Sequence, residues 1–113
     1  MDTSPPAPFP YDGPAEWRAP VVAALMRVVD PEVAMSIVDV GLIYGVTLTD
    51  ERAHVLMTMT SAACPVADTI VEDVENQLDR VLPVDCAIDV ELCWEPAWSP
   101  EKMSERGRRF MGW

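Results

Sequence analysis

The feature that most constrains the fold is a change of hydrophobic period at residues 60–68, where the sequence reads T-S-A-A-C-P-V-A-D. Before this stretch, Val55, Met57 and Met59 alternate with mostly polar residues, which is the period of a strand with two unlike faces. After it, apolar residues recur every three or four positions over 65–82, which is the period of an amphipathic helix. The stretch therefore predicts a strand that leads directly into a helix.

Cys64 falls at the junction of these two elements. Pro65 suits a first helical turn, where its missing N–H would be unpaired anyway, so Cys64 is predicted to be the N-cap. Unpaired N–H groups and the positive end of the helix dipole favour the thiolate there, the form that binds metals. Asp68, Glu72 and Asp73 bring opposing negative charge. Two interpretations remain open: a small buried cysteine filling a tight corner, and a functional thiol.

Composition restricts the class of protein. A length of 113 residues, half of them apolar, suits one compact domain, and a net charge of -11 argues against nucleic-acid and anionic-membrane partners in favour of a basic protein partner. No apolar run approaches the ~20 residues of a membrane helix, and the start lacks signal-peptide features, so we expect a cytoplasmic protein. Three cysteines without C-x-x-C spacing predict neither a disulfide framework nor a self-contained zinc site.

The whole pattern predicts an α+β fold: a two-layer domain in the order α-β-β-α-β. The link through the second helix is a crossover, so the small sheet is expected to be mixed, with the helices on one of its faces. A Trp- and Pro-rich segment with a short helix is expected at the C-terminal end. The predicted elements are a helix over 15–29, a turn at Asp30-Pro31-Glu32, strands over 45–50 and 53–60, a helix over 65–82, a strand over 86–94 and a short helix from Pro100, capped by Ser99.

The first 14 residues differ in composition from the rest. They contain prolines at positions 5, 6, 8, 10 and 14 with few apolar residues between them. We expect residues 1–14 to be a flexible Pro-rich tail with Phe9 and Tyr11 exposed, and residues 15–113 to form a single domain.

Asp39 is an acidic residue within a mostly apolar stretch, S-I-V-D-V-G-L-I-Y at 36–44. One interpretation is that its carboxylate accepts backbone hydrogen bonds in a turn, as aspartate commonly does. The other is that it lies beside Cys64 as a ligand, a base or an orienting group.

The third predicted strand carries the two other cysteines. Cys86 shares a face with apolar residues and is predicted to be in the core, whereas Cys93 shares the opposite face and is either a second thiol or simply half-exposed. His54, the only histidine, lies a strand's length from Cys64, which argues against a catalytic Cys-His pair. The face opposite the core is expected to be polar and open to a partner or to the C-terminal segment; it would carry Thr47, Thr49, His54, Thr58, Asp89, Glu91 and Cys93.

Several short motifs occur together in a recognisable order. They are D-P-E at 30–32, I-V-D-V-G-L-I-Y at 37–44, M-T-M-T at 57–60, C-P at 64–65, and W-x-P-x-W with M-S at 94–104. In this combination the chain resembles, over residues 18–113, the metal-sulfur cluster biosynthesis family. That family includes the SufT-type and PaaD-type iron-sulfur assembly factors and is related to the eukaryotic cytosolic iron-sulfur targeting subunit.

The resemblance implies a role in iron-sulfur cluster assembly or delivery to client proteins. It makes Cys64 the key functional position and places Asp39 and Thr60 beside it. If the protein holds a cluster itself, Cys64 is the expected ligand of a labile iron-sulfur cluster or metal, with Asp39 and Thr60 in the cofactor-binding site; the resemblance leaves open whether it does so or acts as an adaptor. The implied partners are client apo-proteins and iron-sulfur assembly proteins. A homodimer is a further possibility, as one of two ways to complete the ligands of a bound cluster.

Three functions are compatible with these features. A carrier would use one Cys64 thiolate per chain, with a dimer or a client supplying the remaining cluster ligands. A metal-free adaptor would dock clients or cluster carriers through its acidic face and Trp-rich tail. A thiol enzyme would use Cys64 as nucleophile but lacks a placed base, so a carrier or adaptor is favoured over a catalyst. The Cys-rich extension of PaaD-type members is absent, which argues against a specialised role in maturing an oxygenase.

Overall fold

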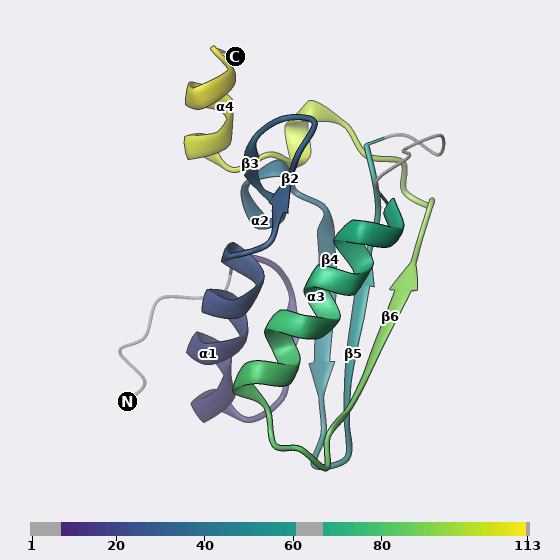
Figure 1. Ribbon diagram of the computed structural model, residues 1–113. Coiled ribbons are helices and arrows are strands. Elements are labelled where there is room, and N and C mark those ends of the chain that lie inside the picture. The colour runs from purple at the N-terminus through teal and green to yellow at the C-terminus, as the bar shows by residue number, and fades with distance from the viewer. Residues whose placement is uncertain (1–7, 61–66, 113) are drawn as a thin grey trace.

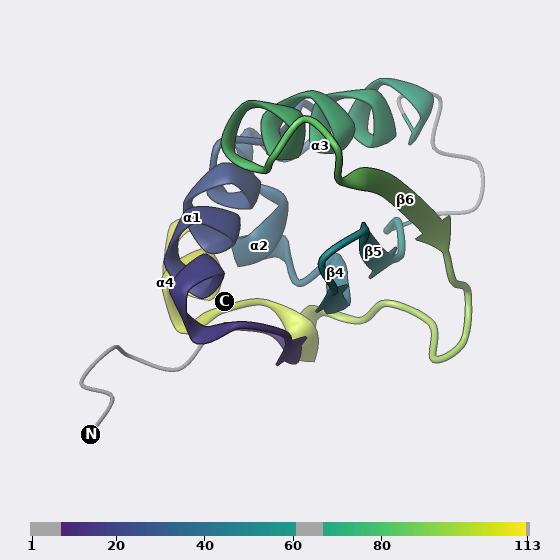
Figure 2. The same cartoon turned by 90° about the horizontal axis from the view of Figure 1, so that it is seen from below.

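Four strands form the central sheet, in the order β1 (Tyr11–Asp12), β4 (Ile43–Leu48), β5 (Arg52–Met57) and β6 (Ala87–Leu92). The computed structural model describes residues 8–60 and 67–112. Helices α1 (Ala15–Met26) and α3 (Ala67–Val81) cover one face of the sheet (Figures 1 and 2). The predicted α+β fold, with a small mixed sheet and helices on one face, is confirmed.

The strand pairing follows the predicted topology. β4 and β5 form an antiparallel hairpin, and β5 and β6 run parallel, so the connection through α3 is a crossover. β5 is shorter than predicted, ending at Met57 rather than 60, although the Thr58 N–H still donates to the Leu42 carbonyl at 2.8 Å. β6 likewise covers 87–92 of the predicted 86–94.

The core lies between the sheet and the two helices. α3 buries one stripe of residues four positions apart and exposes its acidic side chains, as its period predicted. Burial of one aliphatic side chain in this core stabilises the folded state by about 1.5–3 kcal/mol relative to leaving that side chain in water. The completely buried members include Val21, Leu25, Val55, Met57, Ile70, Val74 and Leu78.

A compact connection joins α1 to β4. It contains a two-stranded ribbon, β2 (Val29–Asp30) and β3 (Met35–Ser36), and the short helix α2 (Ile37–Val40). The turn predicted at Asp30-Pro31-Glu32 is present, because the Glu32 N–H donates to the Asp30 carboxylate at 2.9 Å. This turn and ribbon end α1 at Met26, three residues before the predicted limit.

The N-terminal segment packs more closely than expected. Residues 1–7 lie outside the described residues, but the prediction of an exposed Phe9 is wrong, since only 6% of this side chain is accessible. Tyr11 is half-buried in β1, which pairs with β4, and the Val46 N–H donates to the Pro10 carbonyl at 2.9 Å. A short edge strand and one apolar anchor are sufficient to hold a proline-rich segment that has no helix of its own.

The C-terminal segment contains the 3-10 turn η1 (Pro100–Lys102) and the helix α4 (Glu105–Met111). Ser99 was predicted to cap a helix from Pro100, but its side chain makes no capping bond. Ser104 is the cap instead, since its hydroxyl accepts from the Gly107 N–H at 2.9 Å. The predicted helix is therefore split in two.

The open face of the sheet is only partly exposed. Thr47 and Thr49 are exposed as predicted, but Thr58, expected on this polar face, is completely buried. The C-terminal segment crosses this end of the sheet, and the Tyr44 hydroxyl donates to the Pro96 carbonyl at 2.7 Å. Among the described residues, no helix is both long and apolar enough to cross a membrane.

Candidate functional site

Two parts of the chain that carry predicted site residues meet at one end of the sheet. The start of β4 pairs with the end of β5, because Ile43 lies opposite Met57, and the end of β6 is alongside, because Met57 also lies opposite Leu92. α2, which carries Asp39, leads directly into β4, and Thr60 follows β5 by three residues. The topology therefore brings Asp39 and Thr60 to the same end of the sheet, where they come from different elements.

The Asp39 carboxylate binds the C-terminal segment. One oxygen accepts from the Ser104 hydroxyl at 2.7 Å and the other from the Arg106 guanidinium at 2.9 Å. The Asp39 carbonyl also accepts the Ser104 N–H at 2.9 Å. The two carboxylate oxygens therefore bind residues 65 and 67 positions away rather than backbone groups of their own turn.

Two glycines permit this close approach of α2 and the C-terminal segment. Gly41 has φ +87°, and a Cβ there would lie 2.1 Å from the Lys102 carbonyl oxygen. A Cβ on Gly107 would lie 2.7 Å from the Asp39 carbonyl oxygen. Both positions require glycine because the backbones themselves are in contact.

Tyr44 lies at a bulge in β4. The register passes from Ile43 opposite Met57 to Gly45 opposite Leu56, which leaves Tyr44 as the extra residue. Bulges re-aim a side chain and are frequent beside functional sites. Burial raises the pKa of Tyr44 above its ordinary 10.0, and a hydrogen bond with Thr58 acts in the opposite direction. The phenol therefore stays protonated near neutral pH and serves as a donor.

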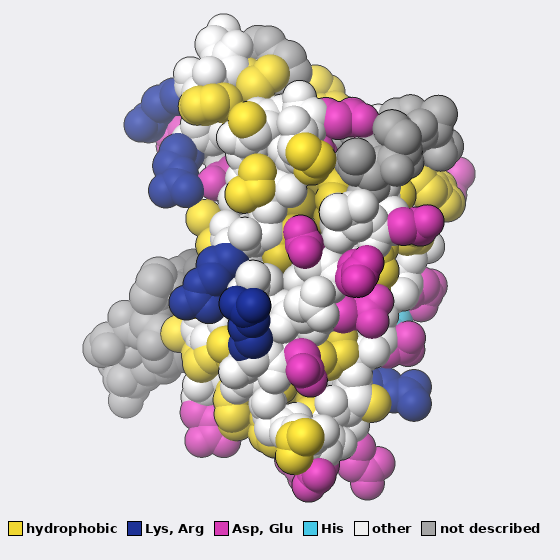
Figure 3. All heavy atoms as spheres, viewed as in Figure 1, with side chains coloured by type: hydrophobic (Ala, Val, Ile, Leu, Met, Phe, Trp, Pro, Cys, Tyr) yellow, Lys and Arg dark blue, Asp and Glu magenta, His cyan; other side chains and the backbone are white. Residues whose placement is uncertain are grey.

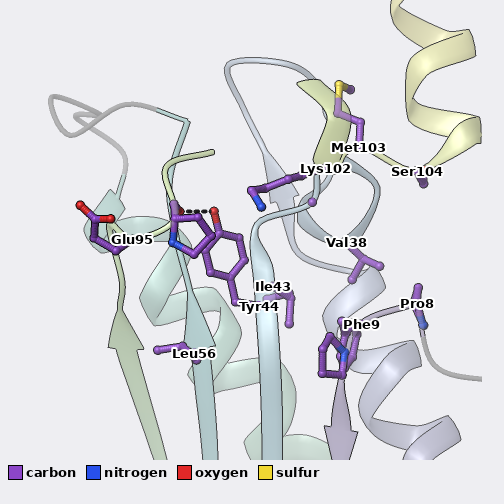
Figure 4. Close-up of a pocket in the computed structure, with 13 residues that line it drawn as sticks. Pro8, Phe9, Val38, Ile43, Tyr44, Leu56, Glu95, Lys102, Met103 and Ser104 are labelled. Atoms are coloured by element: carbon purple, nitrogen blue, oxygen red, sulfur yellow. Dashed lines mark hydrogen bonds between the residues drawn. The ribbon is translucent and has the colours of Figure 1, made fainter. Parts of the chain in front are cut away.

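A groove of about 620 Å³ lies beside Tyr44 (Figure 4). Its walls come from the N-terminal segment 8–10, from β4 and β5, and from the C-terminal segment. Lys102, the only lysine in the sequence, lies with its ammonium 5.0 Å from the centre of the Tyr44 ring, a cation-π distance. The groove thus combines apolar walls with one positive group and, at the other side, Glu95.

Comparison with known proteins identifies the family. The model for the iron-sulfur cluster assembly protein family matches residues 18–90. The chain belongs to this family.

Individual relatives agree with this assignment. The Bacillus subtilis Fe-S protein maturation auxiliary factor YitW is 38% identical over 93 residues, covering 81% of this chain and 90% of that protein. The Staphylococcus aureus Fe-S protein maturation auxiliary factor SufT is 33% identical over 86 residues, covering 75% of this chain and 97% of that protein. A crystal structure from Bacillus anthracis, described as a domain of unknown function, DUF59, matches with a TM-score of 0.80 and 39% identity, covering 86% of this chain and 92% of that one. The family predicted from the motifs, and its general class of function, are confirmed.

The family match includes Asp39, Thr60 and Cys64. Cys64 lies among residues 61–66, outside the described residues, so its N-cap position and its distance from Asp39 and Thr60 stay predictions. Thr60 is half-buried and is the last described residue before that stretch. Of the three predicted site residues of this iron-sulfur assembly protein, only Asp39 has contacts that the structure defines.

The other two cysteines have different environments. Cys86 is buried, and burial raises the pKa of its thiol, so it is held as an unreactive neutral group. Cys93 is half-buried and donates to the Glu95 carbonyl at 2.8 Å. Within residues 8–60 and 67–112, no three His, Cys, Asp or Glu side chains form a group that could hold a metal.

Sequence reasoning missed the partners of Asp39. Ser104 appeared only as part of the M-S motif, and Arg106 was not assigned to the site. The sequence did contain a signal for this contact, because the D-V-G-L and M-S motifs occur together. The two motifs lie more than 60 residues apart, but Asp39 of the first is hydrogen-bonded to Ser104 of the second. Tyr44 and Lys102 were missed because a bulge and a long-range cation-π contact leave no periodic pattern.

Proposed function

We propose that this protein binds a labile iron-sulfur cluster through the Cys64 thiolate and delivers it to client apo-proteins. The observation that carries the proposal is membership of the iron-sulfur cluster assembly protein family, with a match that spans Cys64. The relatives named Fe-S protein maturation auxiliary factors support the same role. The cluster is cargo rather than a resident cofactor.

Labile binding follows from the number of ligands. An iron-sulfur cluster is held by about four thiolates or equivalent groups. This chain offers Cys64, and the described residues contribute no ready-made ligand group. A second copy of the chain, or the client itself, would complete the coordination. A cluster shared in this way can be released by exchange of the second molecule's ligands.

Asp39 is proposed as a positioning residue for the Cys64 site. Its carboxylate and carbonyl bind Ser104, and through them α2 holds the C-terminal segment beside the end of the sheet. Thr60 is proposed to position the stretch that begins at residue 61, since it is half-buried directly before it. Neither residue is proposed to bind the cluster irons.

Anaerobic reconstitution with iron and sulfide tests this function. The protein and three variants, Cys64→Ser, Cys86→Ala and Cys93→Ser, are compared by visible absorption and bound iron. We expect a chromophore in the wild type that is lost only in Cys64→Ser, with iron near one cluster per two chains. Transfer is then followed as the gain of cluster by an apo-ferredoxin. A chromophore that survives in Cys64→Ser, or one that is absent from every protein, contradicts the carrier role.

A metal-free adaptor is the second candidate. Two observations favour it: the absence of a metal-ligating group in the described residues, and the acidic side chains exposed along α3. An adaptor would bring clients and the iron-sulfur assembly proteins together without holding a cluster. In that case Cys64→Ser would retain partner binding in pull-down experiments with purified assembly proteins, whereas a carrier that is bridged by its cluster would lose it.

A further inference from the structure

Strand β6 forms one edge of the sheet. It pairs with β5 on one side, and within the described part of the chain no strand pairs with its other side. Figure 1 shows this strand along the border of the sheet, with α3 beside it. Its six residues form a regular strand without proline or a bulge, which is the geometry that accepts an added strand.

The backbone groups that face outward can be identified from the ladder. The Ala87 N–H donates to the Glu51 carbonyl and the Cys93 N–H to the Met57 carbonyl. In a parallel pair, alternate residues direct both N–H and C=O toward the same neighbour. Odd-numbered residues of β6 therefore point their backbone groups at β5, and Ile88, Val90 and Leu92 point theirs at the free edge.

The two faces of this edge have different chemistry. On the helix-covered face, Ile88, Val90 and Leu92 contact the core but are only half-buried, so each leaves apolar surface at the edge. On the open face, the Asp89 and Glu91 side chains remain 55% and 63% accessible even though they contact Arg52 and His54. A strand added here would place apolar residues on one face and basic residues on the other.

A second copy of this chain is a poor occupant. Antiparallel pairing of two β6 strands about Val90 would place Asp89 of one copy opposite Glu91 of the other, and like charges directly opposite destabilise a sheet. Each chain also carries a net charge of -11, which opposes association. The charge at this edge is instead complementary to lysine and arginine.

We propose that β6 binds an extended segment of a partner protein that alternates apolar and basic residues, adding it to the sheet as a fifth strand. Main-chain hydrogen bonds to Ile88, Val90 and Leu92 would supply the affinity, and Asp89 and Glu91 would select Lys or Arg. The site ends beside the end of β5, because Leu92 lies opposite Met57. The identification of this partner as a client protein rests on the proposed function. The proposal that a strand is added to β6 does not depend on it.

A synthetic peptide of alternating lysine and valine, blocked at both ends, tests the inference without iron. We expect it to bind the metal-free protein, to shift the amide NMR signals of Ile88, Val90 and Leu92, and to slow their hydrogen exchange. The double variant Asp89→Asn/Glu91→Gln should weaken binding roughly two- to thirtyfold, since two cross-strand charge pairs are lost and each contributes up to about 1 kcal/mol. Val90→Pro, which removes an outward N–H, should abolish it.

Matched controls separate strand addition from general attraction to an acidic protein. Glu75→Gln/Asp79→Asn removes two charges from the exposed side of α3 and should weaken binding much less than Asp89→Asn/Glu91→Gln, through slower association alone. A peptide of the same composition, with the lysines and valines in separate blocks, should bind much more weakly. Equal binding of both peptides, equal effects of both double variants, or NMR shifts confined to α3 would overturn the proposal. So would a free protein that is already dimeric through β6.

Because the peptide assay uses no metal, its failure would leave the reconstitution result, and thus the proposed function, untouched. Conversely, a bound peptide together with a failed reconstitution would favour the adaptor.

Discussion

At the scale of single residues, Ser104 has two tasks. Its hydroxyl donates to the Asp39 carboxylate and accepts the Gly107 N–H, so the same atom caps α4 and fastens it to α2. Ser104→Ala should lower the free energy of unfolding by about 1–3 kcal/mol, because both the cap and a buried acceptor lose their partner. Urea denaturation measures this. Ser99→Ala is the control, since that side chain makes no capping bond, and its effect should stay within about 0.5 kcal/mol.

Gly41 and Gly112 allow two costs of a glycine-to-alanine change to be separated: the backbone strain at positive φ, and the steric clash of the added Cβ. Both have positive φ, but a Cβ on Gly41 would meet the Lys102 backbone, whereas nothing lies within 4 Å of one on Gly112. Gly112→Ala should cost about 1–2 kcal/mol at most, the price of the left-handed conformation. Gly41→Ala should cost clearly more and displace the C-terminal segment. Thermal denaturation and the fluorescence of Trp98, which donates to the Val40 carbonyl, report both effects. Equal losses in the two variants would contradict the close contact.

Cys86 should be chemically silent in the folded protein. Burial raises the pKa of its thiol above the ordinary 9.0, so the neutral form persists to higher pH than in the unfolded chain. Iodoacetamide at mildly alkaline pH should modify Cys93, which is half-buried, well before Cys86, as peptide mapping by mass spectrometry would show. As pH rises past the ordinary value, the unfolded thiol ionises first, so this group's contribution to stability is lost at alkaline pH. Fast modification of Cys86 near neutral pH would count against its burial.

Asp39 shows where residue-level prediction stops. Its place in an apolar stretch marked it as unusual, but its carboxylate does not make the backbone hydrogen bonds within its own turn that one interpretation expected. That it lies beside Cys64, the other interpretation, stays a prediction because Cys64 is outside the described residues. Its partners come from a segment more than 60 residues away, and a local pattern contains no information about such a contact.

At the scale of elements, long periodic segments were predictable and short ones were not. The hairpin, α3 and β6 each repeat a period several times, so their existence followed from the sequence, with errors of a few residues at the ends. β1, β2, β3 and α2 have two to four residues each. Elements of this length are fixed by what they pack against rather than by their own residues.

The N-terminal segment gives the clearest test at this scale. Phe9 is buried at the edge of β4, so Phe9→Ala should lower the free energy of unfolding by about 3 kcal/mol or more. Phe110→Ala is the matched control in α4, where 65% of the side chain is accessible, and it should change stability little. Hydrogen exchange should also show faster exchange of the Val46 N–H in Phe9→Ala, because its acceptor is the Pro10 carbonyl. Equal effects of the two variants would show that Phe9 is not an anchor.

At the scale of the whole molecule, the N-terminal segment and the C-terminal segment before α4 line one groove. Pro8 and Phe9 form one wall, and Lys102 to Ser104 form another, over the same end of β4. The sequence predicted the sheet and its two covering helices, since their apolar faces must pack together. It could not predict this meeting of the two segments, which depends on the order of strands and on a bulge at Tyr44.

The distribution of charge over the two sides of the molecule has a kinetic consequence. α4 carries Arg106, Arg108 and Arg109, while α3 and β6 carry exposed acids, and on the face seen in Figure 3 most basic groups lie to the left and most acidic groups at the centre and right. The protein is thus electrically polarised, so its field turns a basic partner toward α3 and β6 before the two molecules touch. Raising NaCl from about 0.05 to 0.5 M should slow association with the lysine-valine peptide about tenfold or more, with little change in dissociation, as stopped-flow mixing would measure. The fold would then supply not only a place for the partner but also the orientation in which it arrives.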